Sequence, residues 1–356
     1  MEKRKKLIKR MGLAALAVII CVPLIIMPAA AATVYEIIFE KRIETVDWMK
    51  FELSEFSGLQ REDRSFELHG KFLAAYEYSA EGVDLPRGIV VVSHGFGGGG
   101  HINYLPFINA FAQNGYLVFA YDAPGNDESE GRVGGFPRGV QALDGALNYI
   151  SARKEYEDLP IMLFGHSWGA YSAANVLNLH PEVSAVALIS GLNESEDVIG
   201  HYARQYAGKF ADMTMPYISF YERLKFGKEF SDISGVSGLE NTDALVLIAH
   251  SADDKTVPIS CGFEIYEDAF GNNSRFTFIR YEDQGHTDIL YSDEAEKRTD
   301  ELNADFDVYV ESLSDKLTPE IKAEYMEENL NRVACFEPDS ELVAAILEVY
   351  DAAVIS

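Results

Sequence analysis

Residues 165–169 read GHSWG, a G-x-S-x-G pattern in which the serine hydroxyl could act as a nucleophile. The apolar stretch before the pattern is typical of a buried strand, and the stretch after it is typical of a helix. A sharp turn between these elements would strain the serine backbone and project its hydroxyl at the helix N-terminus, with glycines on both sides avoiding collisions. We therefore predict that Ser167 is a catalytic nucleophile.

A serine hydroxyl is a weak nucleophile, so it needs a general base and a carboxylate that orients this base. Asp253 and Asp254 follow one strand-like stretch, and His286 follows the next one. The ends of parallel strands meet at one edge of a sheet, so we expect these side chains near Ser167. The two aspartates remain alternatives at this point.

The elements that must position these residues are short apolar runs separated by helical stretches. The runs are 88–94, 116–122, 161–167, 185–190, 244–250 and 275–283. Such alternation predicts an α/β fold with a parallel sheet covered on both faces. Residues 64–79 alternate apolar and polar side chains, which predicts antiparallel strands leading into this sheet.

About 50 residues separate two of these runs, which is longer than an ordinary crossover connection. We expect an inserted helical cap at about 191–242. Met213, Met215, Tyr217 and Phe220 cluster within it, and they could line an apolar acyl pocket over the site. The alternative is that they only pack the cap onto the body.

A glycine-rich loop offers a competing interpretation. Gly95, Gly97 and Gly100 form a G-x-G-x-x-G pattern after a strand, and Asp122 ends the next strand where a ribose-binding acid would stand. A dinucleotide site would leave the serine motif, the acid loop and Gly285-His286 as coincidences. It would also require NAD outside the cell.

The N-terminus indicates export of the chain. Residues 1–10 are basic, and residues 11–35 carry no charge, which predicts either a transmembrane anchor or a signal segment cut near Ala29 to Ala32. The basic residues predict an N-terminus in the cytoplasm. Residues 36–60 are expected to connect this segment to a single domain at 61–356, initially as a continuing helix.

Charge and cysteine content exclude several classes of partner. Residues 36–356 contain 24 Lys and Arg against 56 Asp and Glu, so nucleic acid is a poor partner. Cys261 and Cys335 form neither a disulfide framework nor a metal-type spacing, and either one bridge or two free thiols would fit. We expect no metal ion.

Ser167, one of the two aspartates and His286, in this order, resemble the α/β-hydrolase superfamily over roughly residues 60–356. Within it the chain is most similar to the serine aminopeptidase and monoacylglycerol-lipase-like group, including bacterial membrane-anchored members. The resemblance implies a mostly parallel eight-stranded sheet with helices on both faces and an inserted cap.

The resemblance also implies roles for individual residues. The family pattern HGxxDxxVP, set on residues 250–258, places the acid at Asp254, although Ser251 stands where glycine is usual. The turn His94-Gly95-Phe96 matches the family's oxyanion turn, so the backbone N–H groups of Phe96 and Trp168 would hold the oxyanion. Asp122 would have a structural role in its loop.

The expected function is therefore that of a serine hydrolase. It would cleave ester or amide bonds of small or lipid-like acyl substrates through an acyl-enzyme, without a cofactor. A peptidase of the serine aminopeptidase type is one alternative. A non-catalytic, membrane-anchored binding protein is an alternative of another class. The sequence does not indicate an oligomeric state.

Overall fold

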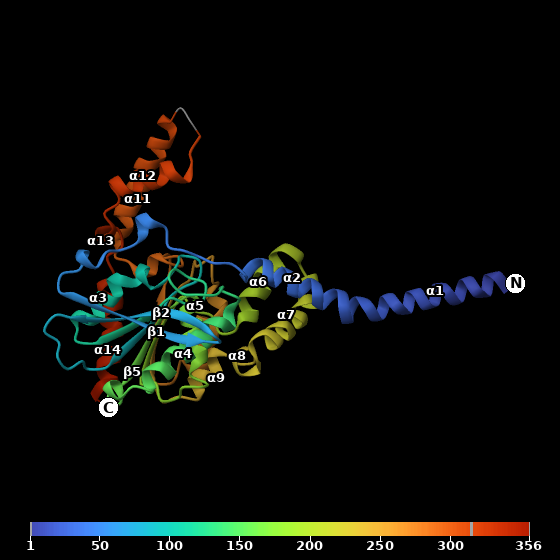
Figure 1. Ribbon diagram of the computed structural model, residues 1–356, viewed down its shortest axis with the longest axis horizontal. Helices are drawn as coiled ribbons and strands as arrows, with labels where there is room; N and C mark the ends of the chain where they lie inside the picture. Colours follow the sequence, from blue (N-terminus) through green and yellow to red (C-terminus); the bar gives the residue numbers. More distant parts are fainter. Residues whose placement is uncertain (1, 314–315, 356) are drawn as a thin grey trace.

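The computed structural model describes residues 2–313 and 316–355, apart from the side chains at 13–20. Its body is one eight-stranded sheet with the strand order β1-β2-β4-β3-β5-β6-β7-β8 (Figure 1). The parallel strands are β3 (Ile89–Ser93), β4 (Leu117–Tyr121), β5 (Ile161–His166), β6 (Ala185–Ile189), β7 (Leu245–Ser251) and β8 (Phe276–Tyr281). The predicted α/β-hydrolase fold is confirmed.

An antiparallel hairpin precedes the parallel strands. Strand β1 (Leu59–Leu68) pairs with β2 (Lys71–Ala80), and β2 pairs with β4. His69 and Gly70 connect the two hairpin strands, and both have positive φ angles, of 50° and 74°. Two-residue hairpin turns with this backbone match the natural twist of the flanking strands.

Helices cover both faces of the sheet, and each face has its own apolar core. On one face lie α4 (Phe136–Ser151), α5 (Trp168–Val176) and α10 (Phe263–Phe270). On the other face lie α3 (Leu105–Gln113) and α14 (Ser340–Ile355). The central strands are therefore buried on both sides, as their continuous apolar sequences predict.

The chain between β6 and β7 forms the inserted helices. They are α6 (Ser195–Ala207), α7 (Phe210–Phe226), α8 (Lys228–Ser231) and α9 (Gly235–Glu240). Helices α6 and α7 pack against each other and stand beside the sheet edge at which the strands end, next to the N-terminal helix (Figure 1).

The N-terminal residues form a long helical segment with a change of pitch. Helix α1 (Glu2–Cys21) passes through a π-helical turn (Val22–Ile26) into α2 (Met27–Phe39). Among the described residues, the stretch Val22–Phe39 is long and apolar enough to span a membrane, and a signal sequence would meet the same criteria. In Figure 1, α1 projects away from the body while α2 lies against the cap.

The segment after α2 differs from the expected continuing helix. The helix ends at Phe39, because Ile43 pairs with Asn126 in a β-bridge and Thr45 binds the Asp127 carboxylate. These contacts hold the chain against the body. The short 3-10 helices are Asp47–Met49, Leu53–Glu55, His101–Tyr104, Lys154–Tyr156, Ile259–Cys261 and Asp288–Leu290.

The C-terminal part adds a helical projection, formed by α11 (Asp293–Ser312) and α12 (Pro319–Asn329) (Figure 1). Helix α13 (Arg332–Cys335) follows it. Cys335 and Cys261 are both buried free thiols, so the open question of their pairing is answered.

Candidate active site

Ser167 lies at a sharp turn between β5 and α5. Its backbone has φ 55° and ψ −115°, a strained conformation for a residue with a side chain. A Cβ atom at Gly165 would overlap the backbone of Gly169, and one at Gly169 would overlap the carbonyl oxygen of Ser93. Both glycines are therefore required for the turn, as the motif predicts.

The structure brings the predicted base to the serine. The Nε2 atom of His286 lies 2.9 Å from Oγ of Ser167, and its Nδ1 atom lies 2.7 Å from Oδ2 of Asp254. A carboxylate can only accept at Nδ1, so Nδ1 carries the proton and Nε2 is free to accept the serine hydroxyl proton. The three side chains come from loops after β5, β7 and β8.

Asp254 is a buried carboxylate with several donors. Its Oδ1 atom accepts the N–H groups of Thr256 (2.8 Å) and Val257 (2.9 Å), and His250 Nε2 lies 3.1 Å from Oδ2. Burial alone would raise its pKa, but hydrogen bonds from His250 and His286 hold the pKa of Asp254 well below its usual range. Asp254 is therefore charged and can stabilise a protonated His286.

Asp253, the other candidate acid, points elsewhere and is exposed. Its Oδ1 atom accepts hydrogen bonds from the hydroxyl of Ser251 (2.7 Å) and the N–H of Gly285 (2.9 Å). The Ser251 hydroxyl in turn accepts the N–H of Gln284 at 2.9 Å. Ser251, which departs from the family pattern, thus helps to brace the loop that bears His286.

Three functional neighbours were not predicted from the sequence: His250, Tyr104 and His166. Burial, with the nearby His286, lowers the pKa of His166 to about 3, so the ring is neutral. Its Nε2 donates to the His286 carbonyl (3.0 Å), and its Nδ1 accepts the Tyr104 hydroxyl (2.7 Å). Tyr104 itself accepts the N–H of Gly95 at 3.0 Å, so this chain joins the base to the predicted oxyanion turn.

The predicted oxyanion donors lie at the same edge of the sheet. The His94-Gly95-Phe96 turn follows β3, which is the neighbour of β5. Trp168 begins α5, and the first N–H groups of a helix have no partner within that helix. His94 Nδ1 donates to the Gly95 carbonyl (2.8 Å), and its Nε2 accepts the N–H of Ala123 (2.9 Å), so His94 shapes this turn.

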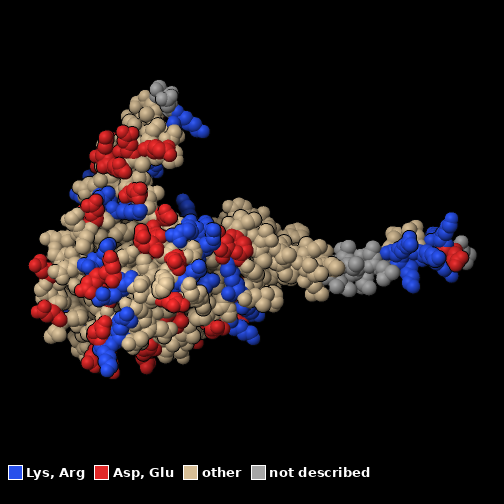
Figure 2. Space-filling model, viewed as in Figure 1, with Lys and Arg blue, Asp and Glu red and all other residues tan. Residues whose placement is uncertain are grey.

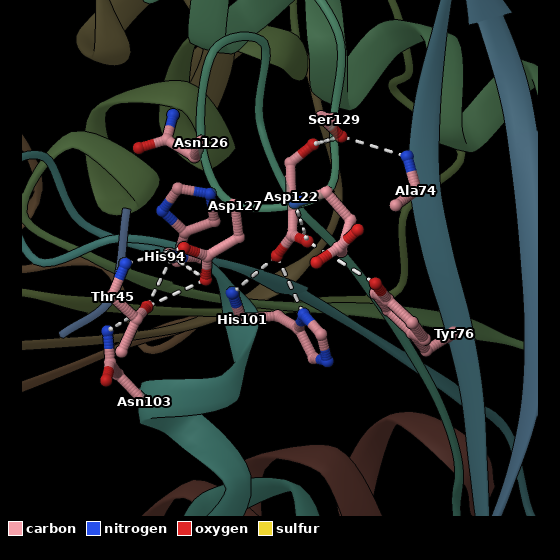
Figure 3. Close-up of polar contacts among 12 residues, drawn as sticks. Thr45, Ala74, Tyr76, His94, His101, Asn103, Asp122, Asn126, Asp127 and Ser129 are labelled. Atoms are coloured by element: carbon pink, nitrogen blue, oxygen red, sulfur yellow. Dashed lines mark hydrogen bonds and ion pairs between the residues drawn. The ribbon is translucent and has the colours of Figure 1, made fainter. Parts of the chain in front are cut away.

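The glycine-rich loop lies beside Thr45, Asp122 and Asp127, whose polar contacts are drawn in Figure 3. A Cβ atom at Gly99 would overlap Thr45, and one at Gly100 would overlap the Asp122 carboxylate. Asp122 accepts hydrogen bonds from the backbone N–H (2.9 Å) and Nδ1 (2.7 Å) of His101. Gly99 and Gly100 are therefore required for packing within the protein, which accounts for these glycines without a dinucleotide.

An apolar cavity of about 640 Å³ opens over Ser167. It lies between α2, α6 and α7. Its walls include Met27, Ala30, Ala31, Val34, Tyr35, Ile38, Phe39, Phe96, Phe136, Val198, Ile199, Tyr202, Ala203, Tyr206, Ala207, Ala211, Thr214, Ile218, Thr256 and Val257. Among the described residues, none of those lining it carries a charge.

Helix α7 lines this cavity as expected, but the face that it turns to the cavity differs from the predicted one. Ala211, Thr214 and Ile218 of α7 line the cavity, at the three- and four-residue spacing of one helix face. The side chains predicted for this role are not among the described lining residues; they are Met213, Met215, Tyr217 and Phe220. Met213 and Phe220 are instead 62% and 50% exposed.

A second cavity, of about 320 Å³, lies on the other side of the cap and does not include Ser167. Its walls are polar and acidic, and Glu194, Glu196 and Glu222 contribute to them. Among the described residues, no group of three or more His, Cys, Asp or Glu side chains could hold a metal ion.

Comparison of the sequence with known proteins finds a matching family and a curated relative. The family described as serine aminopeptidase, S33, matches residues 84–249, which include Ser167 and end before Asp254. Monoglyceride lipase from Rattus norvegicus is 29% identical over 155 residues, covering 42% of this chain and 49% of the relative. The chain thus spans about half the length of that curated relative.

The solved structures agree in fold. An esterase from Pyrococcus furiosus superposes with a TM-score of 0.54 at 15% identity, covering 77% of this chain and 97% of that chain. At this identity the likeness concerns the fold alone. Together with the strand order, it shows that the chain has the α/β-hydrolase fold, and the family match over residues 84–249 is a sequence similarity to the serine aminopeptidase family.

Proposed function

We propose that the protein is a serine hydrolase that cleaves carboxylic esters. The observation that carries this proposal is the chain of hydrogen bonds from Asp254 through His286 to Ser167, which ends at the apolar cavity. Nucleophile, base and orienting acid at these distances are the requirements for acyl transfer.

The steps follow from the geometry. His286 Nε2 takes the proton of Ser167 Oγ as this oxygen attacks the ester carbonyl carbon, and Asp254 stabilises the resulting imidazolium. The N–H groups of Phe96 and Trp168 would hold the oxyanion. Collapse expels the alcohol, which receives the proton from His286. Water, activated by the same base, then hydrolyses the acyl-enzyme.

The distribution of carboxylates supports esters over aminoacyl substrates. A peptidase that binds a free amino terminus needs an acidic side chain close to the nucleophile to pair with the ammonium group. Glu194, Glu196 and Glu222 of the cap line the separate acidic cavity, and Asp197 accepts the backbone N–H of Glu194. The serine aminopeptidase alternative therefore has less support than an esterase or lipase-like activity.

We also propose that the N-terminal helix anchors the enzyme in a membrane, with the N-terminus in the cytoplasm and the catalytic domain on the other side. The uncharged stretch at residues 11–35 and the basic residues before it support this topology. Secretion after cleavage near Ala29 to Ala32 is the alternative.

Hydrolysis assays on the purified full chain test the activity. We expect release of nitrophenol from short- and long-chain nitrophenyl esters, little hydrolysis of aminoacyl anilides, and loss of ester hydrolysis in Ser167→Ala. Anilides cleaved faster than esters would favour the peptidase. A folded protein inactive on both, with ester binding retained, would favour the non-catalytic binding protein.

A further inference from the structure

We infer that α2 forms one wall of the acyl-binding site, and that this site takes the long acyl chain of a membrane ester lipid, which enters between α2 and α6. This inference rests on the proposed esterase function and adds the substrate class and its route. It gives the N-terminal helix a role in catalysis besides anchoring.

The wall is continuous along one face of α2. Ala30, Val34 and Ile38 are spaced four residues apart and all line the cavity. Ala203 and Ala207, two small side chains of α6, line the same cavity. Small side chains on opposing helices leave a slot between the helices instead of a packed seam.

Helix α2 is held in place by specific contacts with α7. The Tyr35 hydroxyl donates to the buried carboxylate of Glu222 at 2.6 Å, and Glu222 also accepts the Ser195 hydroxyl at 2.7 Å. Lys225 forms ion pairs with Glu36 (2.7 Å) and Glu40 (2.8 Å). Because these contacts fix α2 on the cap, the slot is a built part of the enzyme.

The chemistry of the slot selects an acyl chain. Its volume of about 640 Å³ lies within the range of about 300 to 1,000 Å³ that is usual for sites that enclose a small molecule. Its described walls carry no charge, so a charged head group or a peptide amine would lose its hydration there without a partner. An extended hydrocarbon chain has no such cost and gains by leaving water.

The outer end of the slot lies on an apolar surface. Ser167 at the inner end is buried, whereas Tyr206 at the outer end is 89% exposed. Phe210 and Ile25, near the same end of the cap and the N-terminal helix, are 74% and 62% exposed. Figure 2 shows an uncharged surface on the end of the cap and on the adjoining part of the N-terminal helix, up to the residues drawn in grey. Exposed apolar patches mark interaction sites, including membrane contacts, and this one adjoins the proposed membrane anchor, so we infer that the lipid phase supplies the chain.

The same arrangement argues for retention of the N-terminal segment. Cleavage near Ala29 to Ala32 would remove Met27 from the cavity wall, and with a cut after Ala30 it would also remove Ala30. The enzyme acting on long-chain esters would therefore keep the helix, and a cleaved form would have an open slot.

The test uses the full chain in phosphatidylcholine vesicles that contain either the oleate or the butyrate ester of 4-methylumbelliferone. Ala30→Trp and Ala207→Trp place a large side chain in the slot from its two sides. Ala29→Trp and Gln205→Trp are matched controls, because these residues lie on the same helices and are exposed like Ala30 and Ala207, but are not among the described lining residues.

We expect Ala30→Trp and Ala207→Trp to lower the ratio of oleate to butyrate hydrolysis by about tenfold, since an indole ring in the slot would occupy the space of a long acyl chain but not that of a short one. Ala29→Trp and Gln205→Trp should leave both rates unchanged. Thermal unfolding identifies any variant that fails to fold. If one of the two test variants does not fold, the ester ratio of the other one tests the inference.

An unchanged ratio in folded Ala30→Trp and Ala207→Trp would overturn the inference. A protein without residues 2–32 that hydrolyses the oleate ester as fast as the full chain does would also overturn the inference. In both cases butyrate hydrolysis that still requires Ser167 would leave the esterase proposal intact. Failure of the esterase proposal would instead appear as absence of Ser167-dependent hydrolysis of either ester.

Discussion

Among the described residues, two chains of hydrogen bonds run from an aspartate through a histidine to a hydroxyl group, and they differ in what surrounds that hydroxyl group. Asp254, His286 and Ser167 form one, with distances of 2.7 and 2.9 Å. Asp122, His101 and Tyr78 form the other, with distances of 2.7 and 2.8 Å. The distances alone do not distinguish them.

The surroundings of the two hydrogen-bonded chains distinguish them. His101 stacks on Tyr76 with a centroid distance of 4.0 Å, and burial raises the pKa of the Tyr78 hydroxyl, so this chain ends in a closed core. Ser167 lies on a strained turn at the base of a cavity. A carboxylate, an imidazole and a hydroxyl become a catalytic site when the hydroxyl can reach a substrate, and they otherwise serve as a buried polar brace.

The largest expected effect separates the two hydroxyl groups. Ser167→Ala should lower kcat for ester hydrolysis by about 10⁴-fold or more, because no covalent intermediate can form. Tyr78→Phe should leave kcat unchanged, because the hydroxyl ends in the core. Steady-state ester kinetics on both variants provide the measurement, and a comparable loss of kcat in folded Tyr78→Phe would contradict the distinction.

The second prediction compares the two candidate acids, Asp254 and Asp253. Asp254→Asn should lower kcat by about 10⁴-fold, since the amide would favour the wrong tautomer of His286. Asp253→Asn should lower kcat by only about fivefold, which corresponds to about 1 kcal/mol of activation free energy. It weakens only the hydrogen bonds that hold the loop bearing His286. Comparable kcat values for the two variants would show that the acid is assigned to the wrong residue.

The Asp122 chain should contribute to stability. Asp122→Asn is expected to lower the free energy of unfolding by about 2 kcal/mol, because it weakens charge-assisted hydrogen bonds to His101. Urea denaturation of the full chain in detergent provides the measurement. The exposed Asp84→Asn is the control and should leave the free energy unchanged.

The smallest expected effect is a pH dependence of the difference in unfolding free energy between the wild type and Asp122→Asn. Burial opposes the charge of Asp122, but His101 holds the pKa of Asp122 below its usual range. An acid whose folded-state pKa is lowered stabilises the fold above its unfolded pKa, about 3.9, and loses this contribution as the pH falls through the folded value. The stability difference between wild type and Asp122→Asn should be constant from pH 7 to 5 and shrink below about pH 4. A constant difference down to pH 3 would show that the pKa of Asp122 is not lowered in the folded protein.

The sequence was informative wherever a local pattern determines the geometry. The strand runs, the turn at Ser167 and the loops bearing Asp254 and His286 all depend on short-range periodicity or on glycine at fixed positions, which are visible in the chain. The order of strands then brings the three loops to one edge of the sheet.

Features that depend on packing between distant segments were not predictable. Nothing near Tyr104 indicates that it contacts His166, 62 residues away. The aromatic and methionine content of α7 suggested a substrate wall, but only the orientation of the helix on the body decides that Ile218 faces the cavity and Phe220 does not. His250 alone had a local signal, because it stands four residues before Asp254 at the end of a strand.

The central claim is that Ser167 is a nucleophile activated by His286. The most direct test is labelling of the full chain with a fluorophosphonate probe, followed by peptide mass spectrometry to locate the adduct. We expect one adduct, on Ser167, which should be absent from Ser167→Ala and should form much more slowly in Asp254→Asn. A folded protein that remains unlabelled, or an adduct on another residue, would contradict it.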